Sequence, residues 1–244
     1  MSGPPPKPST VTEFIYFRLK PSVKPEDDGG QNREGEQLLD LFRETMLQSG
    51  HLGSAWGRTL EDENNLVWVI EWADATNSIQ TSRLEPFIDN AGDSQSDPTK
   101  LITFFTSLSP PISTTETLTK NPVTELATFA IPDDIAAKSH TQLNIDLNNF
   151  RDALVHRVQP ADIKPVSWSM GQVERPTTFD HPDSSATGKA FAYLLAVGWQ
   201  SKDKHLAARD TKEFKDTIVP LRQVALSPLK GLEMRHITFQ RIGF

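Results

Sequence analysis

The chain has no cysteine among its 244 residues. It can therefore form no disulfide, no cysteine-ligated zinc site and no thiolate nucleophile. It also lacks any apolar run near the roughly 18 residues that cross a bilayer. The opening residues, MSGPPPKPST, lack the apolar centre of a signal peptide. We therefore expect a cytoplasmic protein with no membrane partner.

Clusters of positive charge are absent as well. The formal net charge is -7, and no run of lysine or arginine appears. Because nucleic-acid binding needs clustered cations, we expect no nucleic-acid partner. The six histidines show no HExxH spacing, and no Walker or GxGxxG loop is present. The sequence therefore predicts no metal site and no cofactor.

What the chain does contain is repetition. TEFIYFRL, at Thr12 to Leu19, and TELATFAI, at Thr124 to Ile131, are both β-rich and both open on Thr-Glu. An amphipathic helical pattern follows each, with Phe-Arg-acid at residues 42–44 and again at 150–152. Each copy thus begins as a strand followed by a helix.

The middle of each copy also matches. SAWG, at Ser54 to Gly57, corresponds to WSMG, and each precedes an apolar strand that ends on Trp72 or Trp199. Two residues later, Asp74 or Ser201 can cap a second helix.

A late phenylalanine, Phe87 or Phe214, follows in each copy, and then comes a final strand at residues 100–108 or 232–242. The order is β-α-β-β-α-β, twice, which is the ferredoxin-like unit.

The apolar strands indicate how the copies pack. Residues 65–72 carry Leu66, Trp68, Ile70 and Trp72 on one side and Val67 and Val69 on the other, so both sheet faces must be buried. We predict an α+β fold in which two ferredoxin-like units pack their antiparallel sheets as an intramolecular pseudo-dimeric α+β barrel, with four helices outside.

The predicted boundaries follow from composition. Residues 1–10 are Pro-rich and expected to be disordered, residues 11–110 form the first unit, and residues 123–244 form the second. Residues 111–122, in a stretch rich in Pro, Thr and Ser, are the linker. Residues 20–35 and 174–188 are predicted to be exposed loops.

WGRTLEDENNLVWVIEWAD, at residues 56–74, and GWQSKDKHLAARDTKEF, at residues 198–214, resemble antibiotic-biosynthesis monooxygenase (ABM) domains of the dimeric α+β barrel superfamily. The resemblance covers nearly the whole chain as a tandem duplication. It implies a small apolar cavity in each half, between sheet and helices. Such families include cofactor-independent monooxygenases, polyketide cyclases, decarboxylases, haem-degrading enzymes and stress-responsive members, so the fold alone does not assign the chemistry.

On this resemblance the leading hypothesis is a cofactor-independent tailoring enzyme of secondary metabolism, a monooxygenase acting on a small aromatic or polyketide-like molecule. A cyclase or decarboxylase of the same fold, and a non-catalytic barrel that binds a small molecule or partner, remain alternatives. We expect a monomeric pseudo-dimer and leave open whether it forms a further homodimer.

Cofactor-free oxygenation needs a base and one or two hydrogen-bond donors. His236, within the last strand, is a candidate base, although it could instead satisfy a backbone carbonyl. His205 lies in the first turn of the second helix of copy two, and a surface position is the alternative. The histidine of ABM monooxygenases aligns about one turn later, where this chain has Ala208 and, in copy one, Thr81. A haem-degrading enzyme would have to use His236 or His205 as axial ligand.

Tyr16 and Arg18 share one face of the first strand. Arg18 could bind an enolate or carboxylate through its guanidinium, or could be a solvated strand end. Tyr16 joins it as a candidate catalytic residue. Tyr193 could donate a hydrogen bond to a substrate or pack in the core.

The tryptophans divide into two groups. Trp72 and Trp199 recur at equivalent positions, which favours a packing role. Trp56 and Trp68 correspond to Met170 and Leu195, so they could form the walls of unequal substrate-binding pockets or merely repack a core.

Overall fold

The structure is a computed structural model that describes residues 10–27, 32–90, 100–115, 118, 120–184 and 186–242. The segment 1–10, expected to be disordered, lies outside the described residues except for Thr10. The strands are β1 (Val11–Arg18), β2 (His51–Arg58), β3 (Asn65–Trp72), β4 (Leu101–Thr106), β5 (Val123–Pro132), β6 (Ser167–Arg175), β7 (Phe179–Asp180), β8 (Lys189–Trp199), β9 (Arg235–Ile237) and β10 (Gln240–Arg241). The α-helices are α1 (Arg33–Thr45), α2 (Ile112–Thr115), α3 (Ala137–Asp152), α4 (Lys202–Asp210) and α5 (Lys212–Val224), and the shorter helical turns are η1 (Thr81–Phe87), η2 (Ala153–Arg157) and η3 (Ala161–Ile163).

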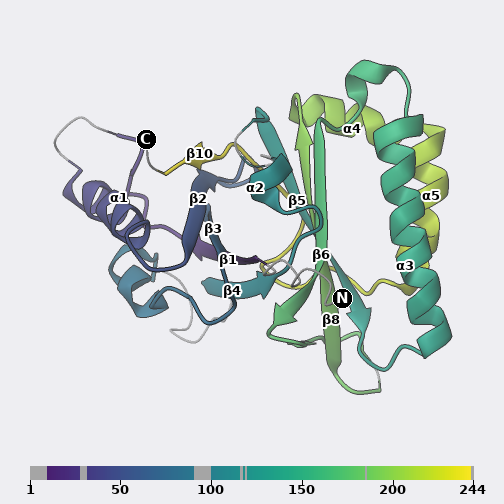
Figure 1. The fold of residues 1–244 in the computed structure, drawn as a ribbon, viewed down its shortest axis with the longest axis horizontal. Helices are drawn as coiled ribbons and strands as arrows, with labels where there is room; N and C mark the ends of the chain where they lie inside the picture. Colours follow the sequence, from purple (N-terminus) through teal and green to yellow (C-terminus); the bar gives the residue numbers. More distant parts are fainter. Residues whose placement is uncertain are drawn as a thin grey trace, which may run out of the picture.

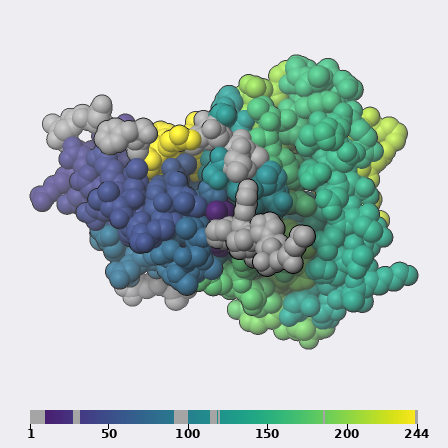
Figure 2. Space-filling model, viewed as in Figure 1, coloured from purple at the N-terminus to yellow at the C-terminus, as the bar shows by residue number. Residues whose placement is uncertain are grey.

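The strands form one curled antiparallel sheet. Its order is β10-β2-β3-β1-β4-β6-β8-β5-β9, and β7 pairs with β8. The two edge strands of the sheet, β9 and β10, follow each other directly in the chain. β9 pairs with β5 at one edge, and β10 pairs with β2 at the other. Ile237 also bridges to Thr59, just beyond β2. The sheet therefore returns to its starting edge, and Figure 2 shows the yellow C-terminal residues beside the blue residues of the first half.

Figure 1 shows α1 on one side of the sheet strands and α3 and α5 on the other side of the molecule, and three apolar clusters hold these layers together. One lies inside the curled sheet and joins both halves through residues such as Phe14, Val69 and Leu194. A second packs α1 and η1 on the outer face of β1 and β3, and a third packs α3 and α5 on the outer face of β5 and β8. Both sheet faces are thus buried, as the alternation in residues 65–72 predicts.

Alternation places each β3 side chain as expected. Trp68, at 0% exposure, belongs to the outer cluster, whereas its neighbours Val67 and Val69 belong to the inner one. The strand order within the first half is β2-β3-β1-β4, and within the second it is β6-β8-β5-β9.

The helix after β3 differs from the prediction. Asp74 does not cap a helix, since its carboxylate accepts from the Thr76 backbone N–H inside a turn. The helical segment η1 begins only at Thr81, is a 3₁₀-helix and contains Pro86, whose ring disfavours a helix interior. Ser201 does cap α4, accepting from the Lys204 N–H at 3.2 Å.

Two loop predictions also need adjustment. Helix α1 begins at Arg33, inside the segment 20–35, because the Asn32 side chain caps it by accepting from the Gly35 N–H. The short strand β7 lies within 174–188. No helix in the described ranges is long and apolar enough to cross a membrane.

Candidate functional site

A cavity of about 380 Å³ lies between the sheet and the helices of the second half. Its walls come from β5, β8, α3, α4, α5 and the segment between α5 and β9. The apolar and aromatic side chains of the wall include Ala127, Phe129, Phe150, Leu195, Phe214, Ile218 and Met234. The polar groups are few, and they are the ones that can do chemistry.

Glu125 is the carboxyl group of this cavity. It lies two residues into β5, and the alternation of the strand directs it, with Ala127 and Phe129, toward the helices. Its Oε2 accepts a hydrogen bond from the indole Nε1 of Trp199 at 3.0 Å. Burial raises the pKa of Glu125 to about 7, although the Trp199 hydrogen bond opposes the rise. A carboxyl group with this pKa can exchange protons near neutral pH.

A row of four side chains, Glu125, His205, His236 and Glu61, begins at Glu125. His205, on α4, places Nε2 at 3.4 Å from Glu125 Oε2 and Nδ1 at 2.7 Å from His236 Nε2. His236 Nδ1 in turn lies 2.7 Å from Oε1 of Glu61, in the turn between β2 and β3. The two histidine side chains are only 3% and 1% exposed. Side chains from both halves of the sequence therefore meet in this row, in which His205, His236 and Glu61 are joined by hydrogen bonds.

The far end of the row is anchored by charge. Glu61 accepts from the His236 backbone N–H at 3.0 Å and from Lys202 Nζ at 2.8 Å. Burial acts to raise the pKa of Glu61, but the hydrogen bonds from Lys202 and His236 prevail and lower it to about 2. Glu61 is therefore an anion at neutral pH.

This anion sets the hydrogen positions on both rings. Burial, followed by the positive charge of neighbouring groups, lowers the pKa of His205 to about 3, and burial also lowers the pKa of His236 despite the nearby Glu61. Both rings are thus neutral near pH 7. Since ionised Glu61 can only accept, His236 Nδ1–H donates to it, His205 Nδ1–H donates to His236 Nε2, and the lone pair of His205 Nε2 faces Glu125.

Two arginines, Arg209 and Arg222, also line the cavity. Neither guanidinium group makes a hydrogen bond or ion pair within the described part of the chain. They could therefore hold a negatively charged oxygen of a ligand.

The predicted candidates are distributed unevenly around this site. His205 lines the cavity, and His236 lies directly behind it. Tyr193 does not line the cavity, and its hydroxyl donates to Asn144 Oδ1 at 2.8 Å.

Arg18 and Tyr16 lie elsewhere. Arg18 pairs with Asp62 and lies 3.6 Å from Asp89. Tyr16 packs inside the curled sheet, stacked on Phe104 with ring centres 5.8 Å apart. Burial raises the pKa of Tyr16 above its usual value, so its hydroxyl stays protonated.

Trp56 and Trp68 fill the corresponding space of the first half. Both rings pack on Phe42. The distance between ring centres is 4.3 Å for Trp68 and Phe42 and 6.0 Å for Trp56 and Phe42. Trp56 also borders a surface groove beside α1 and β10.

The carboxyl groups of Glu125 and Glu61 were not among the predicted candidates. The repeated Thr-Glu was a usable signal, because Glu13 accepts from Trp72 Nε1 at 2.8 Å just as Glu125 accepts from Trp199. Glu61 gave no signal, since its contact with His236 spans 175 residues.

No protein-family model and no curated protein matches the chain. Solved structures do resemble it. An anthrone oxidase-like protein superposes with a TM-score of 0.54 at 11% identity, covering 97% of this chain and 94% of that one. A candidate monooxygenase of Fusobacterium nucleatum superposes at 0.51 and 12% identity, covering 96% and 93%. A candidate chlorite dismutase superposes at 0.51 and 10% identity, covering 95% and 94%. At these identities the likeness shows the α+β barrel fold alone.

The resemblance in the sequence includes haem-degrading enzymes, so the histidines must be tested as haem ligands. A haem iron needs a free imidazole nitrogen. Both ring nitrogens of His205 face other groups, His236 at 2.7 Å and Glu125 at 3.4 Å, and both of His236 are hydrogen-bonded. The cavity therefore does not fit a haem ligand set. Among the described residues, no group of three or more His, Asp or Glu could hold a metal ion.

Proposed function

We propose that the chain is a small-molecule tailoring enzyme of the cofactor-independent monooxygenase type, acting in the cavity of the second half. The observation that carries the proposal is Glu125, a partly buried carboxyl group with a pKa of about 7 in an otherwise largely apolar cavity. Catalytic bases combine a water-poor site with a pKa near working pH. The anthrone oxidase-like neighbour supports the same class of chemistry.

The substrate is an aromatic or polyketide-like molecule with an acidic C–H or phenol. Phe129, Phe150 and Phe214 offer ring faces, and the volume of about 380 Å³ suits a small fused-ring compound. Arg209 and Arg222 would stabilise the enolate or phenolate oxygen that forms when the proton leaves.

The proposed proton transfer uses the row of side chains. Glu125 takes the proton from the substrate and, once protonated, donates it as a hydrogen bond to His205 Nε2. His236 and Glu61 act as positioning residues, because ionised Glu61 fixes the tautomer of both rings and stabilises positive charge that develops on them.

The resulting carbanion reacts with oxygen inside the largely apolar cavity. For an anthrone, the ring methylene becomes a carbonyl, so one oxygen atom of O₂ stays in the product and the other leaves as water with the two hydrogens.

We also infer that residues 11–110 and 123–244 are two ferredoxin-like copies joined by the linker 111–122. The matching strand orders and the two Glu-Trp pairs support this duplication. The chain would then work as a cytoplasmic monomeric pseudo-dimer.

The test is incubation with dithranol, a dihydroxyanthrone, in air and under argon, with oxygen uptake and product spectrum as readouts. We expect one O₂ consumed per anthraquinone formed and no turnover under argon. Equal turnover in air and under argon would contradict the proposal of a monooxygenase and favour a cyclase or decarboxylase.

A non-catalytic binding protein is the second candidate, favoured by Ala208 and Thr81 at the places where ABM enzymes carry histidine. It predicts that dithranol binds without turnover in air.

A further inference from the structure

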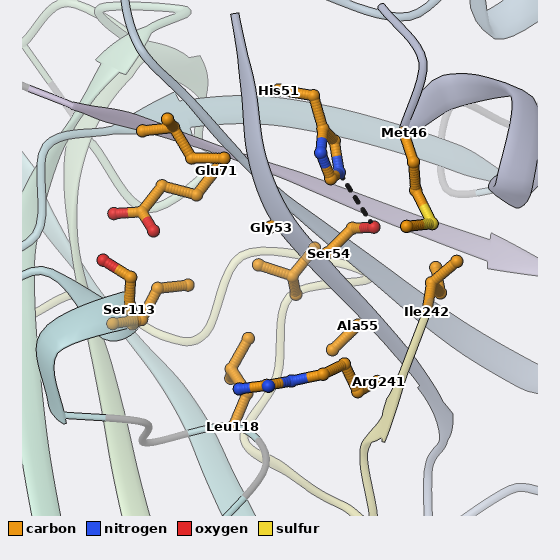
Figure 3. Close-up of a pocket in the computed structure, with 13 residues that line it drawn as sticks. Met46, His51, Gly53, Ser54, Ala55, Glu71, Ser113, Leu118, Arg241 and Ile242 are labelled. Atoms are coloured by element: carbon orange, nitrogen blue, oxygen red, sulfur yellow. Dashed lines mark hydrogen bonds between the residues drawn. The ribbon is translucent and has the colours of Figure 1, made fainter. Parts of the chain in front are cut away.

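A second cavity, of about 450 Å³, lies at one end of the curled sheet (Figure 3). Its walls come from β2, β3, α2 and the last described residues, and it shares no lining residue with the cavity of Glu125. It is therefore a separate place for a ligand.

Glu71, on β3, is the buried polar group of this cavity. The residue is only 3% exposed, and its Oε1 has no hydrogen-bond partner among the described residues. Figure 3 shows its carboxyl group reaching into the space beside Ser113. A buried acceptor without a partner is costly, so a ligand that supplies a donor would gain that interaction.

The space beside this carboxyl depends on a glycine. Gly53 is paired directly with Glu71 across β2 and β3, and cross-strand neighbours project to the same face. A Cβ at Gly53 would meet nothing within 4 Å. A side chain there would therefore start in the open space beside the carboxyl group of Glu71.

The remaining walls are chiefly apolar, with Ala55, Val69, Ile112 and Leu118 among them. Ser54 Oγ lies 3.1 Å from His51 Nε2. Burial lowers the pKa of His51, so its ring adds no charge near pH 7. Arg241 is the cation of the lining and lies near Leu118 in Figure 3, which disfavours a ligand with two positive charges.

We propose that this cavity binds a small hydrophobic primary amine with a single positive charge, whose ammonium group donates to Glu71 while its apolar body rests on Val69, Ile112 and Leu118. An ammonium supplies several donors, and a hydrogen bond to a charged group is stronger than a neutral one.

The test is isothermal titration with phenethylamine, alongside 2-phenylethanol and 3-phenylpropionate as neutral and anionic analogues. We expect phenethylamine to bind at least tenfold more tightly than either analogue. Glu71→Gln should weaken its binding at least tenfold, and Gly53→Leu should abolish it by filling the space. Glu125→Gln should leave it unchanged, which separates this cavity from the proposed active site.

Absence of phenethylamine binding, equal binding of the three compounds, or full binding to Glu71→Gln would overturn the proposal. If Glu71→Gln does not fold by circular dichroism, Gly53→Leu decides, and undiminished binding by that variant is the contradicting result. Dithranol turnover should be unchanged in both variants, so failure here is independent of the proposed function.

Discussion

The two halves of the molecule place the same pair of side chains in different surroundings. Glu13 accepts from Trp72 and Glu125 from Trp199, and burial raises the pKa of both carboxyl groups to about 7. Glu13 is sealed, at 0% exposure, and its second contact is the Ile79 backbone N–H at 3.3 Å. Glu125 opens on a cavity and faces His205.

The size of the neighbouring side chains explains why Glu125 borders a cavity and Glu13 does not. Trp56 and Trp68 pack on Phe42 in the first half, whereas Met170 and Leu195 occupy their positions in the second. A perturbed carboxyl group is therefore not a site by itself. It becomes one where the side chains around it leave room for a substrate.

The largest expected effect separates the two glutamates. Glu125→Gln should lower dithranol turnover on the order of 10²- to 10⁴-fold, since it removes the base while keeping an acceptor for Trp199. Glu13→Gln is the matched control, and it should leave turnover unchanged. Oxygen uptake measures both, and equal losses in the two variants would erase the proposed difference between the halves.

Exchanging the large and small side chains at positions 68 and 195 should open a void in the first half and fill the cavity in the second. Trp68→Leu should lower the free energy of unfolding by about 3 kcal/mol, because it leaves a void in a fully buried cluster. The reciprocal Leu195→Trp should instead abolish dithranol binding by filling the cavity that Leu195 lines. Urea unfolding and ligand titration give the two readouts. A Leu195→Trp protein that folds and still binds dithranol would show that the cavity is not the binding site.

The sealed glutamate should be visible in the pH dependence of stability. Because the folded-state pKa of Glu13 is about 7 against an ordinary 4.5, the folded protein holds the extra proton between these values. Its contribution to stability is therefore lost as pH rises from about 4.5 to 7, by up to about 3 kcal/mol.

Glu13→Gln cannot ionise and should escape this loss. Urea unfolding of wild type and variant at pH 5 and at pH 7.5 should show the variant gaining relative stability at the higher pH. Parallel curves would mean that Glu13 titrates normally.

The smallest effect on turnover is expected for Glu61, which lies at the end of the row farthest from the cavity. Glu61→Gln should lower kcat about tenfold with little change in KM, since the side chain stabilises His236 without touching substrate. The pH dependence of kcat should shift as well, a change that a purely structural role would not produce. Glu63→Gln, two residues away and exposed, is the control. Wild-type kinetics in Glu61→Gln would remove Glu61 from the proton relay.

The repeated segments predicted the order of the main strands along the chain, and the alternation in residues 65–72 predicted that both sheet faces are buried. The second helix of the first half was not predictable from spacing alone, because Pro86 and the weak helix formers after Asp74 leave only the 3₁₀ segment η1. The site was predictable in part. His205 and His236 stood out as histidines in apolar surroundings, but their contact, and that of His236 with Glu61, depends on how the last strand returns to β2.

Carbon-13 NMR titration of the glutamate side chains, with and without 1-naphthol, reads the pKa of Glu13 and Glu125 and the response of each to a ligand. We expect both to titrate near pH 7 in the free protein, and we expect added 1-naphthol to shift the Glu125 signal and its pKa while the Glu13 signal stays unchanged. A Glu125 signal that is unchanged by 1-naphthol, or a Glu13 signal that shifts instead, would contradict the proposed difference between the two glutamates.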